Sequence, residues 1–477
     1  MNQDFENAPL AIVGMACRLP GADDLEGFWR LLRGGGSGIA ELPPERLDRE
    51  LYYHPAKGVR NKSYSALGGL VSARPFDRVA CALPDELIAS ADQAHLTLCE
   101  VAASACRHAK LDPFDLPLRN TGVYVGHTAA SPLASQVAYA ASAAQMAQFV
   151  GQVDAIRSLP TAERNELIQE IVAAVRSQYP PLDGGTTVDL SSHAAAGLIS
   201  NGFGLTGPFL VVDAACASSL QALMIGAAAL RRGRVDMAIV GGASYCKSDT
   251  LVLFSQAQSL SAKGSRPFDA EADGLILAEG YVVLVVKTVA RALADGDQIH
   301  AVIRGLGMAT DGRGKSLWAP RKEGQVLAIR RAYGGNVDVR ALQYIEAHAT
   351  STQIGDATEL HALAEALAGR LPPGTKIPIG SVKANVGHTL EAAGLAGLMK
   401  TVLAIENRII PPAINCTRLN PEFNWVEAPF FVPTSELPWP EPQPGQPRRA
   451  GVNSFGIGGL NVHVVLDEFL ESAAGQA

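Results

Sequence analysis

The sequence is poor in charged residues and has no basic cluster. Only 18% of its 477 residues are Asp, Glu, Lys or Arg, the formal net charge is −7, and no run rich in Lys or Arg occurs. Proteins that bind nucleic acid usually carry such a run or patch, because they must neutralise phosphates. We therefore expect no nucleic-acid partner.

The pattern of a secretory leader or a membrane span is also missing. The first residues, MNQDFENAPLAIVGMACRLPG, are acidic where a signal peptide is basic, and their apolar stretch is short and interrupted by glycine. The most apolar stretch, residues 209–230, holds Asp213, Ser218, Ser219 and Gln221 near its middle, where a membrane helix is apolar. We expect a cytoplasmic protein without a membrane span.

The cysteines show no pairing pattern. There are seven of them, an odd number, and none forms a CxxC pair: Cys17, Cys81, Cys99, Cys106, Cys216, Cys246 and Cys416. This spacing predicts neither a disulfide framework nor a zinc site. We expect reduced thiols, most of them buried in the core.

Hydrophobic residues and glycine are abundant, with 47% of the residues hydrophobic and 47 of them Gly. Apolar runs of strand length alternate with helix-length patterns. The predicted strands are 10–15, 123–126, 209–212, 237–241, 281–286, 301–306, 344–347, 377–380 and 461–466, and the predicted helices include 25–32, 166–179, 219–232 and 391–406. This alternation predicts mixed α/β layers with a largely parallel sheet.

Residues 128–165 are rich in Ala, Ser and Gln and show no clear element of their own. They separate the predicted strand 123–126 from the predicted helix 166–179, which indicates an insertion. No Ser/Gly or Pro/Gln linker interrupts the chain internally, so we expect one compact unit.

Cys216 stands where a predicted strand runs directly into a predicted helix, in Val211-Val-Asp-Ala-Ala-Cys216-Ala-Ser-Ser-Leu220. A thiol at a helix N-terminus meets unpaired N–H groups and the positive end of the helix dipole, and both favour the thiolate. A small buried core residue is the alternative, and it is the commoner one for a cysteine taken at random. The neighbouring motifs have to decide between the two.

Two histidines follow strand ends in polar loops. His348 lies in Glu346-Ala-His-Ala-Thr-Ser-Thr352, and His388 lies in Lys383-Ala-Asn-Val-Gly-His-Thr-Leu-Glu391. A lone histidine is more often a hydrogen-bonded structural residue than a catalyst. Ligands bind at the carboxyl ends of strands in α/β folds, however, so the pair points to a functional site.

A glycine-dense segment with one large aromatic residue, Gly451-Val-Asn-Ser-Phe455-Gly-Ile-Gly-Gly459, precedes the last predicted strand. Glycine permits the backbone to approach a ligand closely. A plain hairpin or tight turn explains the segment equally well.

A fifth segment, Gly202-Phe-Gly-Leu-Thr-Gly207, matches G-x-G-x-x-G. It leads into Pro208 and a strand, whereas a dinucleotide fingerprint follows a strand and opens a helix. The position disfavours a nicotinamide-dependent dehydrogenase.

In this order, the segments with Cys216, His348, His388 and Phe455 resemble the β-ketoacyl synthases of polyketide and fatty acid assembly. The resemblance covers nearly the whole chain and includes Ala11-Ile-Val-Gly-Met-Ala-Cys-Arg-Leu-Pro-Gly21 and Arg266-Pro-Phe-Asp269. It implies a thiolase-like five-layer αβαβα sandwich built from two similar halves. Residues 1–295 would carry the nucleophile and an inserted segment near 128–190, at a dimer surface or acyl pocket, and residues 296–477 would carry both histidines.

The resemblance also implies roles for individual residues. Cys216 would take an acyl group, and His348 and His388 would stabilise the enolate formed when a malonyl-type extender loses carbon dioxide. Backbone N–H groups of Cys216 and Phe455 would form an oxyanion hole, with Phe455 also gating the pockets. Lys383, supported by Glu391, would order the site. The pantetheine arm or substrate would be bound by Thr350, Thr352, Asn453 and Phe455.

Partners follow from the same resemblance. We expect an acyl carrier protein that delivers its phosphopantetheine arm, no permanently bound cofactor or metal, and a homodimer. Two alternatives stay open. One is a related acyltransferase or decarboxylase that does not extend the chain, and the other is a noncatalytic partner subunit that sets chain length.

The sequence departs from the commonest polyketide pattern at four places. Ala349 and Ser351 stand where His-Gly-Thr-Gly-Thr is usual, Ala217 replaces a serine, and Gly197-Leu198 replaces Gly-Arg. Ala349 would be strained only at a positive φ, at a cost of about 1 kcal/mol. None of these changes removes a reacting group, so they bear on substrate and partner choice.

Overall fold

The fold is built on a large β-sheet. The computed structural model describes residues 8–118, 120–128, 132–178, 191–314, 316, 318–335 and 337–471. Within them, eleven strands pair in the order β12-β10-β9-β14-β15-β8-β1-β7-β6-β4-β5. Their bounds are β1 Leu10–Arg18, β4 Thr121–Gly126, β5 Phe209–Val212, β6 Met237–Ser244, β7 Gly280–Thr288, β8 Ala301–Thr310, β9 Leu342–Glu346, β10 Ile377–Gly380, β12 Phe430–Phe431, β14 Arg449–Phe455 and β15 Leu460–Asp467.

The sheet repeats one five-strand pattern twice. From β1 outward, the order β1-β7-β6-β4-β5 pairs antiparallel, antiparallel, parallel and parallel. From β8 outward, the order β8-β15-β14-β9-β10 pairs in the same succession. Strands β1 and β8 pair antiparallel where the two copies meet. The internal duplication, which the sequence alone does not reveal by inspection, is therefore visible in the strand order.

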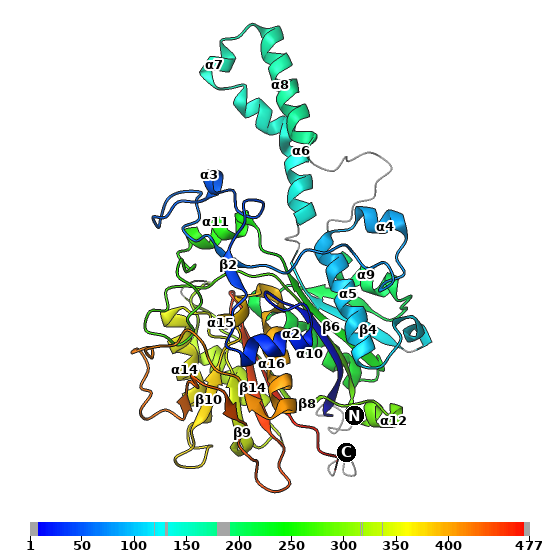
Figure 1. Cartoon of the computed structure of the whole chain (residues 1–477), viewed down its shortest axis with the longest axis vertical. Coiled ribbons are helices and arrows are strands. Elements are labelled where there is room, and N and C mark those ends of the chain that lie inside the picture. Colours follow the sequence, from blue (N-terminus) through cyan, green and yellow to red (C-terminus); the bar gives the residue numbers. More distant parts are fainter. Residues whose placement is uncertain are drawn as a thin grey trace.

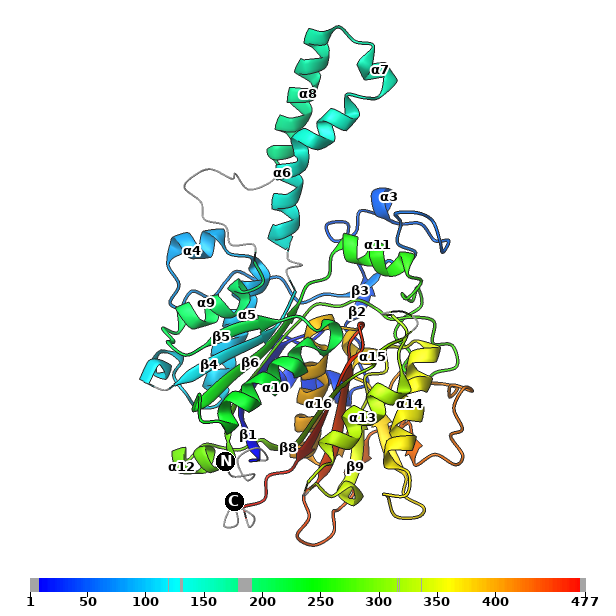
Figure 2. The ribbon, with the colours of Figure 1, turned by 180° about the vertical axis from the view of Figure 1, so that it is seen from behind.

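Helices complete the five layers (Figures 1 and 2). Helices α5 (Gln93–His108) and α9 (Ala194–Gly202) cover one outer face, and α13 (Lys322–Ala332) and α14 (Gln353–Leu367) cover the other. Helices α10 (Ser218–Arg231) and α16 (Ala393–Asn407) lie between the two halves of the sheet and fill the largest hydrophobic core. The α/β sandwich expected from the resemblance is confirmed.

Smaller elements connect these layers. The short strands pair as β2 with β3 and β11 with β13. The remaining elements are α2 Leu25–Arg33, β2 Ile39–Glu41, α3 Arg49–Tyr52, β3 Leu67–Gly69, α4 Asp85–Ser90, η1 Pro113–Leu118, η2 Ala215–Ala217, α11 Ser248–Gln256, α12 Val289–Asp295, η3 Val339–Ala341, α15 Lys383–Val386, η4 Leu390–Ala392, β11 Ile409–Ile410 and β13 Leu437–Pro438.

Two glycines let the central helices sit against the strand ends. A Cβ at Gly126 would clash with the backbone of Ser218 and Ser219 at the start of α10. A Cβ at Gly242 would lie 2.8 Å from the Ser219 side chain and 2.9 Å from the Ala392 backbone. Contacts this short are not tolerated between real side chains and backbone. The close approach places the N-termini of both central helices at the carboxyl ends of β4, β5 and β6.

The strand pairing corrects two sequence-based predictions. The sheet is mixed and not largely parallel, because β1, β7, β8 and β15 pair antiparallel with their neighbours. The glycine-dense segment is not a loop over its first half, because Gly451–Phe455 belongs to β14, which is buried throughout. Glycine lowers strand propensity, and only the flanking strands β9 and β15 make this segment extended.

A helical hairpin projects from the body (Figure 1). It consists of α6 (Pro132–Val150), α7 (Asp154–Arg157) and α8 (Thr161–Arg176), and Ala143, Ala147 and Val172 form its small core. The prediction that residues 128–165 lack an element is therefore wrong over α6 and α7. Alanine favours helix, but α6 has little polar–apolar periodicity to indicate one. Residues 129–131 and 179–190 of the predicted insertion lie outside the described residues.

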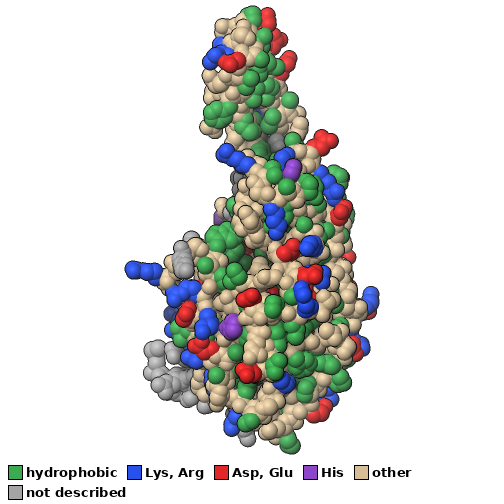
Figure 3. All heavy atoms as spheres, turned by 90° about the vertical axis from the view of Figure 1, so that its left-hand side faces the viewer, with side chains coloured by type: hydrophobic (Ala, Val, Ile, Leu, Met, Phe, Trp, Pro, Cys, Tyr) green, Lys and Arg blue, Asp and Glu red, His purple; other side chains and the backbone are tan. Residues whose placement is uncertain are grey.

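Hydrophobic side chains are exposed on this hairpin among polar and charged ones (Figure 3). The side chains of Tyr139, Met146, Phe149 and Val153 are exposed on it. Even so, no helix among the described residues is both long and apolar enough to cross a bilayer.

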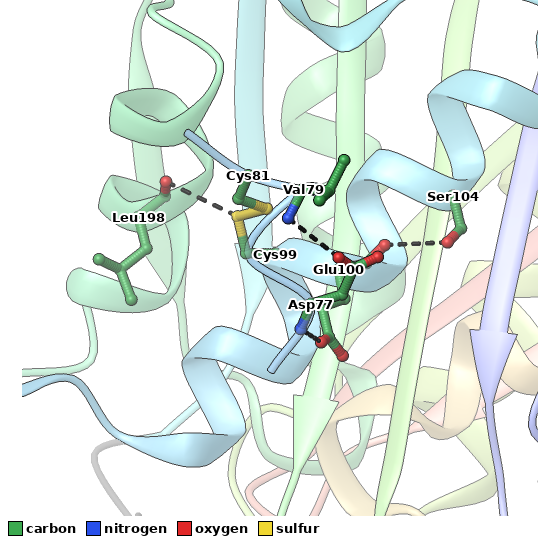
Figure 4. Close-up of a disulfide and its surroundings, with 7 residues drawn as sticks. All are labelled: Asp77, Val79, Cys81, Cys99, Glu100, Ser104 and Leu198. Carbon is green, nitrogen blue, oxygen red and sulfur yellow. Dashed lines mark hydrogen bonds between the residues drawn. A yellow bond between two sulfur atoms is a disulfide. The ribbon is translucent and has the colours of Figure 1, made fainter. Parts of the chain in front are cut away.

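Two cysteines are joined in a disulfide. Cys81, in the coil before α4, is bonded to Cys99 of α5, 18 residues further along the chain (Figure 4). The expectation that all seven cysteines are reduced thiols is wrong for this pair, since a contact made by a coil folding back on a helix leaves no sequence motif. The other five are free, namely Cys17, Cys106, Cys216, Cys246 and Cys416.

Candidate functional site

Cys216 lies in a tight turn between strand β5 and helix α10. Ala215 has a positive φ of 51°, and the turn is held by side chains on both sides. The N–H of Ala215 donates to Asp213 Oδ1 at 2.9 Å, and the hydroxyl of Ser218 donates to the carbonyl of Ala215 at 2.6 Å. The sequence folds this way because Asp and Ser bond readily to nearby backbone groups. The turn presents the Cys216 sulfur at the end of the strand.

The two histidines come from the other half of the sheet and meet this sulfur. His388, which follows α15, has its Nε2 3.1 Å from Cys216 Sγ. His348, which follows β9, has its ring centroid 5.6 Å from that of His388 and 5.7 Å from that of Phe455. The sulfur and one nitrogen of each ring lie within 4.8 Å of one another. The structure thus brings together three residues, of which the first and the last, Cys216 and His388, are 172 positions apart in the sequence.

A cavity of about 520 Å³ opens onto these groups. Its lining includes six of the residues proposed from the sequence: Cys216, His348, His388, Thr350, Thr352 and Phe455. The two threonine hydroxyls lie 3.2 Å apart. A polar arm that enters here can therefore meet hydroxyl groups before it reaches the sulfur.

Three further residues expected at the site do not line this cavity. Lys383 is buried, and the acidic groups that act on it are Glu346, Glu359 and Asp356. Glu391 is not among them, because its neighbours are Thr128 and Asp213. The proposed support of Lys383 by Glu391 therefore stays a prediction.

Asn453 also lies behind the cavity wall. Its amide donates to Glu359 Oε1 at 2.7 Å, and its oxygen faces His463 Nδ1 at 2.5 Å. Glu359 in turn accepts the backbone N–H groups of His348 and Ala349, at 2.8 and 2.7 Å. Asn453 thus helps to fix the loop that carries His348, and its contact with substrate stays a prediction.

We expect Asn453→Ala to act on stability and not on substrate affinity. The change leaves a buried carboxylate and a buried imidazole each short of a partner, which costs about 1–3 kcal/mol. Thermal unfolding should therefore occur at a lower temperature, while KM for an acyl thioester stays unchanged. A raised KM with an unchanged unfolding temperature would restore the substrate-binding role.

Two side chains that no sequence motif indicates help to position the reacting residues. Glu359 lies on α14, 11 residues after His348, and its carboxylate accepts a hydrogen bond from the His348 backbone N–H. Ser454 donates its hydroxyl to the carbonyl of Cys216 at 2.7 Å and ties β14 to the nucleophile turn. Neither contact follows from residue spacing. The first depends on the packing of α14 against the His348 loop within the second half, and the second joins the two halves.

Burial sets the charge state of the site. It raises the pKa of the Cys216 thiol to about 11, against the opposing effects of the Ile457 N–H and Lys383. Burial, followed by the charge of Lys383, holds the pKa values of His348 and His388 well below their usual value. These shifts favour a neutral thiol and two neutral imidazoles. They oppose the effect of the helix terminus, which favours the thiolate.

This charge state predicts how alkylation of Cys216 depends on pH. Only the thiolate reacts, so below the raised pKa its fraction grows tenfold per pH unit. The rate of modification by iodoacetamide, read on the Cys216 peptide by mass, should rise steadily from pH 7 to 10 without levelling near 8.5, the ordinary thiol pKa. A rate that is constant between pH 5 and 8 would instead indicate a thiolate–imidazolium pair.

Neither imidazole is fixed in one tautomer. Within the part of the chain that the structure describes, Nδ1 of His348 and Nδ1 of His388 have no hydrogen-bond partner. The partner of one ring nitrogen normally decides which nitrogen carries the proton. Both rings can therefore accept a proton at Nε2 in one step and donate from it in another.

Backbone strain surrounds the site. Positive φ angles occur at Ser351 (68°) and Leu390 (39°) as well as at Ala215. Ala349 does not have a positive φ. The strain that the sequence analysis considered at Ala349 lies instead at Ser351, two residues later. Strained residues of this kind cluster at functional sites.

The same donor atoms could hold a metal ion. One sulfur and two imidazole nitrogens form a donor set that suits zinc. No second group of this kind occurs in the described ranges. An ion bound here would occupy the nucleophile, so metal binding and nucleophilic chemistry exclude each other at this position.

Comparison with protein families identifies the chain. The N-terminal domain of β-ketoacyl synthases matches residues 7–292, and the C-terminal domain matches residues 300–417. A ketoacyl-synthetase C-terminal extension matches residues 420–476.

Curated relatives are large polyketide synthases. A mycocerosic acid synthase-like polyketide synthase of Mycolicibacterium smegmatis is 36% identical over 474 residues, which cover 98% of this chain and 20% of the relative. The pikromycin polyketide synthase component PikAIII of Streptomyces venezuelae is 35% identical over 474 residues, which cover 96% and 28%. The chain thus spans less than a third of the length of these relatives.

Solved structures of ketosynthases share the fold. The ketosynthase from module 6 of the bacillaene synthase of Bacillus subtilis superimposes with a TM-score of 0.81 at 29% identity, over 97% of this chain and 72% of that one. The oxazolomycin ketosynthase domain OzmH KS7 of Streptomyces albus gives 0.82 at 29% identity, over 97% and 75%. The chain therefore belongs to the β-ketoacyl synthase family and has the thiolase-like fold of ketosynthase domains.

Proposed function

We propose that this chain catalyses a decarboxylative Claisen condensation between an acyl group bound to Cys216 and a malonyl-type extender on an acyl carrier protein. One observation carries the proposal, namely that Cys216 Sγ lies 3.1 Å from His388 Nε2 at the wall of a cavity that His348 also lines. Nucleophile, base and a second imidazole are thus within reach of one thioester.

The first half-reaction loads the enzyme. The Cys216 sulfur attacks the acyl carbonyl carbon while its proton passes to His388 Nε2. The new carbon–sulfur bond forms and the bond to the carrier sulfur breaks. The carrier thiol leaves with the proton from His388, so no net proton is consumed.

The second half-reaction forms the carbon–carbon bond. The bond between the malonyl carboxylate and its α-carbon breaks, carbon dioxide leaves, and the electron pair becomes an enolate whose oxygen is stabilised by His348 and His388. The enolate carbon attacks the acyl carbonyl on Cys216. The N–H groups of Cys216 and Phe455 stabilise the tetrahedral oxyanion, which collapses to the 3-ketoacyl carrier and releases Cys216, which then regains a proton.

The proposal also assigns the groups around the reacting atoms. The carrier's phosphopantetheine arm would enter along Thr350 and Thr352, and Phe455 would gate the passage. Lys383 would act as a positioning residue through its field on the two imidazoles. We place the boundary between the two halves near residue 296, where α12 ends before β8 begins.

A homodimer in the cytoplasm is part of this proposal. Strand β5, which leads into Cys216, is an edge of the sheet, and its Phe209 is exposed. An unpaired edge strand readily pairs with another chain. A second copy paired along β5 would bring the two Cys216 turns near one interface.

The mass of the carrier-bound product tests the function. Incubation with an acyl thioester and malonyl carrier protein should give a carrier-bound 3-ketoacyl chain that is two carbons longer than the acyl group. Transfer of the unchanged acyl group, or acetyl carrier alone, would show instead a transferase or a decarboxylase that does not extend the chain. Absence of both loading and product would favour a noncatalytic partner.

A further inference from the structure

A second, smaller cavity also reaches the nucleophile. Its volume is about 220 Å³, and it shares Cys216, Phe254 and Ile457 with the first cavity. Its other lining residues are His127, Thr128, Asp213, Ala215, Tyr245, Thr250, Leu390 and Glu391. The first cavity contains the two threonines proposed to meet the carrier arm, so this second one, which we call the acyl chamber, is free to hold the chain attached to sulfur.

The acyl chamber has a largely apolar wall that carries two carboxyl groups, those of Glu391 and Asp213. Glu391 is buried, with 7% of its surface exposed, and its carboxyl is hydrogen-bonded to Thr128 and faces Asp213. No Lys or Arg occurs among the described lining residues of the chamber. His127 adds no positive charge, because burial lowers the pKa of this ring. A plain hydrocarbon chain needs only the apolar part of this wall, so the two carboxyl groups are the feature that could distinguish one acyl chain from another.

Burial makes the charged form of Glu391 energetically unfavourable. Burial, with a contribution from Asp213, raises the pKa of Glu391 to about 7. The carboxyl accepts from the Thr128 side chain and from its own backbone N–H, and a carboxylate has further acceptor positions that a ligand can use. An apolar chain beside Glu391 would offer these positions no hydrogen bond, whereas a chain with a donor would supply one.

We propose that Glu391, assisted by Asp213, selects acyl chains that carry a hydrogen-bond donor, a hydroxyl or a protonated amine, on the first carbons after the thioester. This inference rests on the proposed function and adds a substrate class to it. Glu391 acts here as a specificity residue, because Cys216, His348 and His388 carry the bond making.

Competition between matched thioesters tests the inference. The probes are the N-acetylcysteamine thioesters of butyrate, 3-hydroxybutyrate and 3-aminobutyrate, which share the same carbon chain. The readout is the rate at which Cys216 gains each acyl mass in the intact protein. We expect the hydroxy and amino probes to load at least about tenfold faster than the butyryl probe.

Variants of Glu391 separate charge from hydrogen bonding. Glu391→Gln should remove the preference for the amine and keep part of that for the hydroxyl, because an amide still accepts a hydrogen bond. Glu391→Leu should make butyryl the fastest probe. The surface variant Glu365→Gln, which removes an exposed carboxylate paired with Lys322, should leave the ranking unchanged.

The possible results separate a failure of the proposed substrate selection from a failure of the proposed function. Two results would overturn the proposed selection and leave the condensing function intact. One is that the three probes load Cys216 in the same order in wild type and in both Glu391 variants, and the other is that wild type prefers the butyryl probe. Loading that persists in Cys216→Ala, or no loading by any probe, would contradict the function itself and the selection with it. If Glu391→Leu fails to fold, the loss of the amine preference in Glu391→Gln decides alone.

Discussion

Replacing Cys216 by alanine is expected to abolish acyl loading, with a fall of at least about a thousandfold in the rate of uptake from an acyl thioester. The reason is that no other thiol can take its place. None of the other four free thiols, Cys17, Cys106, Cys246 and Cys416, lines the cavity with the two histidines, and burial raises the pKa of each of them. Intact-protein mass after incubation with the thioester gives the result.

The fold should survive this change. Cys216 is small, and the turn around it is held by Asp213, Ser218 and Ser454 through bonds that do not involve the sulfur. We therefore expect a stability change within about 1–2 kcal/mol, measured by thermal unfolding. Cys416→Ala is the matched control, because this free cysteine is more exposed than Cys216, and its loading should equal that of wild type. A Cys216→Ala protein that still gains the acyl mass would refute the assignment of the nucleophile.

The histidine variants should separate the two half-reactions. His348 has no recorded bond to the sulfur, so His348→Ala should leave Cys216 acylation within about tenfold of wild type. Condensation and release of carbon dioxide from malonyl carrier protein should fall by about 10²–10³, the usual effect of removing one donor to a developing oxyanion. His388 contacts Cys216 directly at 3.1 Å, so His388→Ala should slow acylation as well, by about 10²–10⁴.

Separate assays of each step make the comparison clean. Acylation is followed by intact mass, and decarboxylation by the carbon dioxide released from malonyl carrier protein. His54→Ala, which changes an exposed histidine far along the chain from the site, should be indistinguishable from wild type in both assays. If decarboxylation were unchanged in both active-site variants, the enolate would have to be stabilised by other groups.

The sequence predicted the elements whose signal is local. The apolar runs 209–212 and 377–380 were located to the residue, because a short buried strand is set off by its polar flanks. The Cys216 turn and both histidine loops followed from the same logic, since polar residues just after strand ends gather at one edge of a sheet. Of the six predicted residues that line the main cavity, Cys216, His348 and His388 were indicated in this way, whereas the roles of Thr350, Thr352 and Phe455 were implied by the family resemblance.

What the sequence could not predict depends on contacts between distant segments. The resemblance implies that Asn453 binds substrate, but it does not show that the hydrogen bonds of this side chain go to Glu359 and His463. It implies that Glu391 supports Lys383, but it does not show that Glu391 bonds to Thr128 and lies near Asp213. The direction of Asn453 is set by packing within the second half and that of Glu391 by contact with the first half, and no spacing rule encodes either.

The repeated sheet order explains why the site lies where it does. Strands β5 and β10 are the corresponding strands of the two copies, and they lead to Cys216 and to the segment of His388. The glycines at the strand ends let the central helices α10 and α16 bring these segments together. Each half contributes part of the chemistry, and neither contains a complete set of reacting groups.

A single-turnover reaction tests most directly whether one sulfur and two imidazoles carry out the whole condensation. Protein loaded with one acyl group on Cys216 is mixed with malonyl carrier protein, and carbon dioxide, carrier-bound product and remaining acyl-enzyme are measured together. We predict that one carbon dioxide and one extended chain appear for each acyl group lost from Cys216. Carbon dioxide without loss of the acyl group, or loss of the acyl group without an extended chain, would show that this site does not join the two substrates.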